Sequence, residues 1–121
     1  MSLIVCAYRR DAGGAIEWIE EEPPFPCNDL AGPESWRHKI WGSPELRRLG
    51  LRMLPSLAEA DVYAEDDELD AIEAELGMLR EALPALAAVL KVDAEGLRFR
   101  VENIAAAVRI ARAHGGGVYM G

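Results

Sequence analysis

The chain has 121 residues and a formal net charge of −8, and half of its residues are hydrophobic. This length suits one domain that needs neither a metal ion nor a disulfide bond for stability. The acidic balance argues against direct nucleic-acid binding, because phosphate recognition needs clustered Lys and Arg side chains. The first residues carry no basic leader and only a short apolar run, so we expect a cytoplasmic protein with no membrane association.

The first 22 residues predict a β-hairpin. Leu3–Tyr8 is apolar and β-prone, and Asp11–Gly14 is typical of a turn. Ala15–Glu22 alternates between apolar and polar residues, which favours a second strand that pairs with the first.

The next segment, Pro23–Gly42, is expected to be irregular. Its three early prolines lack an amide N–H and have a fixed φ. Trp36 and Trp41 lie in this segment, either as a binding hot spot or as part of the core, and we favour the core because indoles are usually mostly buried.

Ser43-Pro44 is a clear helix start, since Ser43 can cap the first turn and proline suits the first helical position. We expect Pro55 to end this helix. A short strand is expected around Val62 and Tyr63.

Two apolar stripes predict the remaining helices. One helix should begin near Asp66 and break at Pro84, with a short helix over Ala85–Leu90. The last helix carries a stripe from Leu97 to Ala111 and should end at Gly115–Gly117. Val118–Met120 is apolar and is expected to join the sheet.

These elements predict a single α+β domain over residues 1–121. In it, the N-terminal hairpin and the C-terminal strand form a small sheet that packs against three to four α-helices.

The negative charge is concentrated in one segment. Nine acidic residues and no Lys or Arg lie between Glu59 and Glu75, and the rest of the chain carries a net charge of +1. Two interpretations remain open: a solvated helix with favourable N-terminal charges, or a surface that docks on a basic partner protein. For the second, we predict as partner-binding residues Asp61, Tyr63, Glu65, Asp66, Asp67, Glu68, Asp70 and Glu73.

No catalytic motif is present, so we expect no enzyme activity and no cofactor. The acidic segment lacks the glycine-centred spacing of a calcium loop, and no metal site is expected. His114 would cap a helix C-terminus. A small enzyme or ligand-binding domain would have to use Cys27, Glu34 and His38, brought together in one pocket.

Two stretches resemble small bacterial immunity proteins of polymorphic or secreted toxin systems. One runs from Trp41 through Ser43 and Glu45-Leu46-Arg47 to Gly50, and the other from Arg100-Val101-Glu102-Asn103-Ile104 to Gly116-Gly117-Val118-Tyr119. The resemblance implies an inhibitor that binds a cognate toxin and catalyses nothing. The alternative is a structural or self-associating module, such as a homodimer.

Overall fold

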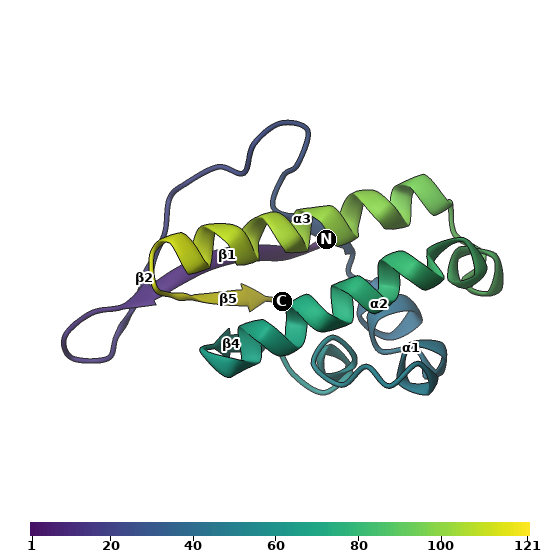
Figure 1. Ribbon diagram of the computed structural model, residues 1–121, viewed down its shortest axis with the longest axis horizontal. Coiled ribbons are helices and arrows are strands. Elements are labelled where there is room, and N and C mark those ends of the chain that lie inside the picture. The colour runs from purple at the N-terminus through teal and green to yellow at the C-terminus, as the bar shows by residue number, and fades with distance from the viewer.

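An antiparallel five-stranded sheet and three α-helices make up the protein, as the α+β prediction requires. The computed structural model describes all residues, 1–121. The strands are β1 (Ser2–Arg10), β2 (Ile16–Trp18), β3 (Leu30–Pro33), β4 (Val62–Glu65) and β5 (Gly117–Met120). The helices are α1 (Pro44–Arg48), α2 (Asp67–Leu90) and α3 (Ala94–Ala113), and Figure 1 shows their arrangement.

The sheet has the order β2-β1-β5-β4, and β3 also pairs with β1. The expected hairpin is confirmed, although β2 is shorter than the alternating stretch suggested. The C-terminal strand joins the sheet as expected, where β5 lies between β1 and β4 and pairs with both. Residues far apart in sequence, at positions 6, 63 and 119, are therefore neighbours across the sheet.

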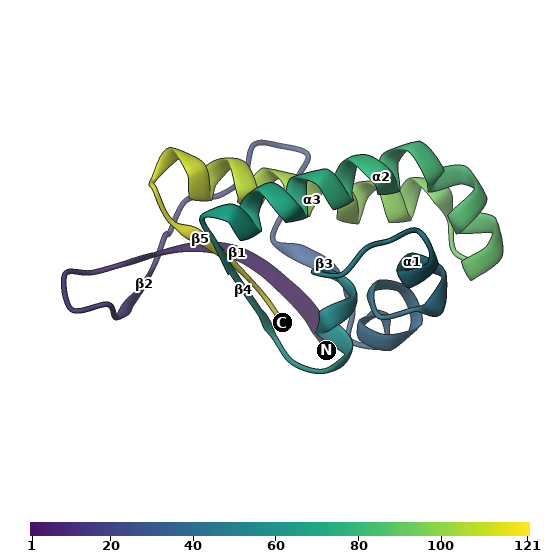
Figure 2. The ribbon, with the colours of Figure 1, turned by 60° about the horizontal axis from the view of Figure 1, so that its bottom comes forward.

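The helices α2 and α3 cover one face of the sheet and leave the other face open (Figure 2). Leu3, Val5 and Ala7 of β1 point toward the helices and are buried, because successive strand side chains alternate between faces. The α3 stripe that includes Val101, Ile104 and Val108 is buried in the same core. No helix combines the length and the apolar composition that a membrane crossing requires.

Pro84 does not break the second long helix, and that prediction is wrong. The helix α2 continues through Pro84 to Leu90. Proline has no amide N–H, so the carbonyl four residues earlier loses its helical hydrogen-bond partner. Pro84 lies on the exposed side of the helix, where this carbonyl can bond to water. Leu83 and Leu86 stay on the buried stripe, and their burial outweighs the local cost of the proline.

The proline-rich segment is less irregular than predicted. It contains β3 and a short π-helix over Arg37–Trp41. Trp41 is fully buried and its Nε1 donates to the Ala31 carbonyl at 2.9 Å, which confirms its expected place in the core. Trp36 is partly buried against it.

The first helix starts as predicted but ends early. Ser43 caps α1 by accepting a hydrogen bond from the Leu46 amide. The helix ends at Arg48, and Pro55 instead begins a short 3₁₀ helix, Pro55–Ala58, where proline fits the first position.

Two buried polar side chains hold the irregular segments on the helices. The Glu75 carboxylate on α2 accepts the backbone amides of Arg52, Met53 and Leu54 at 2.7, 2.8 and 2.9 Å. Asn103 on α3 exchanges hydrogen bonds with Asn28 and also donates to the Leu30 carbonyl. Each side chain satisfies backbone groups of neighbouring segments, most of them outside regular structure, as burial demands.

Glu75→Ala should lower the free energy of unfolding by about 3 kcal/mol, because three backbone amides lose a charged acceptor in one step. Glu75→Gln should lose less, since one acceptor oxygen remains. Urea denaturation measures both, with Glu81→Ala as the control on an exposed position of the same helix. Equal stability of Glu75→Ala and Glu81→Ala would contradict this role.

Candidate functional site

The open face of the sheet carries a cluster of aromatic side chains. Cys6, Tyr119 and Tyr63 form one cross-strand row, and Tyr8 and Trp18 are paired in the next row. We define the aromatic face as this set together with Ile4: residues Ile4, Cys6, Tyr8, Trp18, Tyr63 and Tyr119. Side chains at alternate positions of one strand share a face, and paired residues share it across strands, so all six lie opposite the helices.

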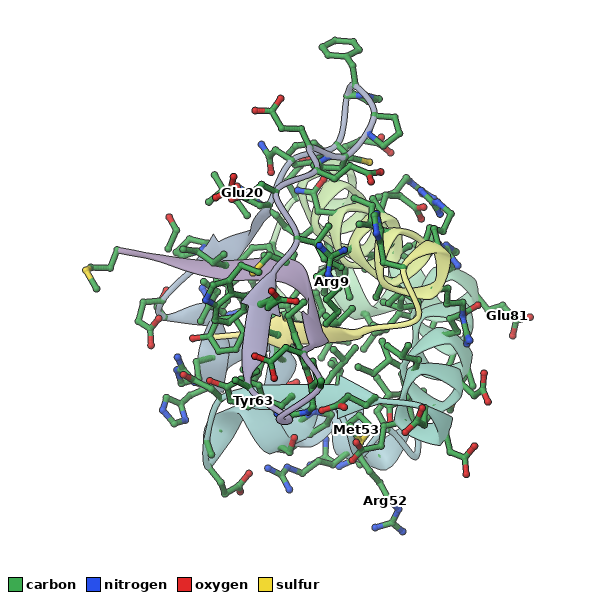
Figure 3. The ribbon with its side chains drawn as sticks, turned by 90° about the vertical axis from the view of Figure 1, so that its left-hand side faces the viewer. Arg9, Glu20, Arg52, Met53, Tyr63 and Glu81 are labelled. Carbon is green, nitrogen blue, oxygen red and sulfur yellow. The ribbon has the colours of Figure 1, made fainter.

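The rings form a continuous layer. Trp18 meets Tyr119 with ring centroids 5.5 Å apart, and Tyr119 meets Tyr63 at 5.0 Å. Tyr8 contacts both Trp18 and Tyr63 at about 6 Å. In Figure 3, seen from the end of the β1–β2 hairpin, Tyr63 lies on the side of the sheet away from the helices. Trp18 and Tyr63 keep 51% and 46% of their surface exposed, and Ile4 keeps 42%.

Tyr8 is the buried centre of this layer. Its partner across the strands is Gly117, where a Cβ would lie 2.8 Å from the Tyr8 ring and 2.6 Å from the Ala64 carbonyl oxygen. The missing side chain lets the ring lean across β5, and its hydroxyl donates to Glu65 on β4 at 2.7 Å. The hydrogen bond from Tyr8 to Glu65 therefore spans three strands, β1, β5 and β4, on one face of the sheet.

Two carboxylates border the aromatic face, and each is held by an arginine and a tyrosine. Glu65 accepts hydrogen bonds from Arg10, with a shortest distance of 2.8 Å, and from Tyr8. Asp61 pairs with Arg37 at 3.1 Å and accepts from the Tyr119 hydroxyl at 2.9 Å. Arg10 pairs with Glu65 alone, whereas Arg37 is shared between Asp61 and Glu34.

The charged partners shift the pKa values of these groups. The Arg10 guanidinium, and next the Tyr8 hydroxyl, hold the pKa of the Glu65 carboxyl below its ordinary value. Burial and then the hydrogen bond to Glu65 raise the pKa of Tyr8, and burial with the bond to Asp61 raises the pKa of Tyr119 to about 12. Both tyrosines are therefore neutral hydrogen-bond donors at physiological pH.

The acidic segment does not form one uncompensated surface. Arginines from outside the segment pair with five of its nine carboxylates, namely Glu59, Asp61, Glu65, Asp70 and Glu73. A sixth, Glu75, is buried and capped by backbone amides. The sequence shows no positive charge nearby because these arginines come from other elements: Arg10 from β1, Arg37 from the π-helix, Arg47 from α1 and Arg112 from α3.

Of the predicted partner-binding residues, three carboxylates have no ion-pair partner: Asp66, Asp67 and Glu68. They lie at the start of α2, directly after Glu65, where the chain turns sharply with a positive φ of 52° at Asp66. Asp61, Tyr63 and Glu65 lie on the open face of the sheet. Asp70 and Glu73 lie instead against α3, through Arg112.

A second concave feature lies along the outer edge of β1. We define the edge groove as the cavity of about 460 Å³ between β1, α3 and the segment 19–29. Figure 1 shows that segment as an arch beside α3. Cys6 and Cys27, both free thiols, line the groove.

The proposed enzyme or ligand site is not assembled. Cys27 lines the edge groove, whereas Glu34 and His38 do not. No group of three or more His, Cys, Asp or Glu side chains is arranged to hold a metal ion. His114 caps the C-terminus of α3, as expected, and contacts Glu21 at 2.8 Å.

A scan against protein-family models and searches of curated proteins and of solved structures found no match to this chain. The fold and the aromatic face define it as a small α+β domain whose most distinctive surface is the open side of its sheet.

Arg10→Ala should raise the pKa of the Glu65 carboxyl toward the ordinary value of 4.5, and Tyr8→Phe should raise it less. Because folding favours the ionised carboxylate, Glu65 stabilises the fold above its unfolded pKa, and this contribution is lost as pH falls through the lowered folded value. Carboxyl NMR titration measures the shifts, with Arg48→Ala, on α1, as control. A larger effect for Tyr8→Phe than for Arg10→Ala would contradict this assignment.

Proposed function

We propose that this protein binds another protein through its aromatic face. The observation that carries the proposal is a solvent-exposed layer of Trp18, Tyr63 and Ile4 on the side of the sheet that no helix covers. Trp and Tyr are the residue types most enriched among binding hot spots, because they bury a large rigid surface at low entropic cost.

The support for this layer as a binding surface is its construction. Tyr8 is fully buried beneath the other rings and fixed by Glu65, so the layer is preorganised before any partner arrives. The two arginine–carboxylate pairs lie at its edges, so an aromatic centre has polar borders. That anatomy is typical of protein interfaces, where an apolar centre is surrounded by a polar rim.

For the partner, we propose a basic protein, and the resemblance to immunity proteins suggests a cognate toxin. The proposal assigns the unpaired carboxylates of Asp66, Asp67 and Glu68 to the rim, where they would mainly speed association. Affinity would come from the aromatic face, because most of the other carboxylates of the acidic segment already contact arginines of the chain. In this form the proposed inhibitor depends on aromatic contact more than on charge.

Trp18→Ala and Tyr63→Ala should each weaken partner binding by at least about tenfold, or about 1.4 kcal/mol. The partner is first identified by a photo-crosslinking amino acid at position 63, with the product encoded by the neighbouring gene as the first candidate. The matched control is position 89, because Val89 is 62% exposed on α2 away from the aromatic face.

Isothermal titration with the purified partner then compares the two variants with Val89→Ala. Equal affinity of all three would reject the aromatic face as the binding surface. A crosslink from position 63 to a second copy of the chain, with dimers in analytical ultracentrifugation, would establish the homodimer in place of a different partner.

Charge reversal at Asp66 and Asp67 should slow association with a basic partner and reduce its salt dependence, while dissociation changes little. Stopped-flow kinetics at low and high salt measures both rates. Each single reversal, at Asp66 or at Asp67, is compared with Glu81→Lys, the same change in charge elsewhere on α2. If the Asp66 and Asp67 variants associate at the same rate as the Glu81→Lys variant, only the net charge of the protein matters and the rim assignment is rejected.

A further inference from the structure

The edge groove has a chemical character different from that of the aromatic face. Half of its lining is hydrophobic and includes Ile19, Ala107 and Ile110. Four acidic residues also line it: Glu21 contacts His114, whereas Glu20, Glu22 and Asp29 have no ion-pair partner. No Lys, Arg or His lines the cavity, so the charge of these three carboxylates is not compensated there.

The main chain of β1 is also incompletely paired there. The chain leaves β2 at Ile19, whose amide bonds to the Ala7 carbonyl, and it returns at Asp29, whose carbonyl accepts the Val5 amide. The Val5 carbonyl and the Ala7 amide, which point to the same edge, have no hydrogen-bond partner. One acceptor and one donor therefore remain open on a strand that borders the cavity.

We propose that the edge groove binds an arginine or lysine side chain presented by an extended segment of another protein. The methylene stem of such a side chain packs on the hydrophobic part of the lining while its charged end meets the three free carboxylates. The cavity of about 460 Å³ has the size of a ligand pocket, roughly 300–1,000 Å³.

The open backbone groups favour a peptide over other cations. A metal ion or a polyamine offers no acceptor for the Ala7 amide, whereas a peptide main chain offers both an acceptor and a donor. Nucleic acid is disfavoured because its phosphates would face the carboxylates of Glu20, Glu22 and Asp29. The proposed site lies at the edge of β1, so this proposal does not depend on whether the aromatic face binds a partner.

The test is an NMR titration of the full chain with a blocked peptide, acetyl-Gly-Arg-Gly-amide. Amide signals of Ala7, Ile19 and Asn28 should shift on addition of this peptide, whereas acetyl-Gly-Glu-Gly-amide should leave them in place. No shift at these residues with the arginine peptide, or equal shifts with both peptides, would overturn the proposal.

A variant with Glu20→Gln, Glu22→Gln and Asp29→Asn should bind the arginine peptide at least about tenfold more weakly. The matched control removes the same number of charges elsewhere, by Asp66→Asn, Asp67→Asn and Glu68→Gln, and should bind within about twofold of the wild type. Equal weakening in both triple variants would mean that net charge alone attracts the peptide, and the groove would be rejected.

Ethylguanidinium alone tests the main-chain contribution. It carries the cationic end of arginine without a peptide group, so it should bind at least about tenfold more weakly than the peptide and leave the Ala7 amide signal in place. Equal affinity of ethylguanidinium and the peptide would overturn the proposed contact with the β1 edge.

Discussion

The rest of the structure depends on one constraint: two long helices cover only one face of the sheet. Since strand side chains alternate, burial of Val5, Val62 and Val118 beneath the helices directs their neighbours to the opposite side. Those neighbours include Tyr63 and Tyr119 of the aromatic face. A sheet with one open face can thus present a broad aromatic surface without weakening the core that supports it.

The aromatic face and its borders form one connected unit. Tyr8 reaches across Gly117 to Glu65, and Arg10 lies over the Tyr8 ring while it binds the same carboxylate. A side chain at position 117 would collide with this arrangement. The sheet, the ring layer and the ion pair consequently support each other, which gives the surface a fixed shape rather than a flexible one.

The charge distribution changes the physical account of recognition. The acidic segment is continuous in sequence, yet its carboxylates meet arginines from four other elements. Exposed pairs of this kind contribute little to stability, and four arginines offset only part of the charge of the nine carboxylates. Free carboxylates remain at the start of α2 and around the edge groove, where Glu20, Glu22 and Asp29 are unpaired.

The sequence by itself determined the elements whose signals are local. Apolar periodicity set α3, the Ser43-Pro44 pair set the start of α1, and β-prone runs set β1 and β5. The sequence predicts Tyr63 as a partner-binding residue but not Trp18 or Tyr119, because these join it only through pairing across the sheet. Other features depend on which surfaces are buried together: the pairing of distant strands, the ion-pair partners and the continuation of α2 through Pro84. Burial is a property of the whole fold. Only the tertiary structure therefore decided where aromatic side chains and unpaired carboxylates lie on the surface.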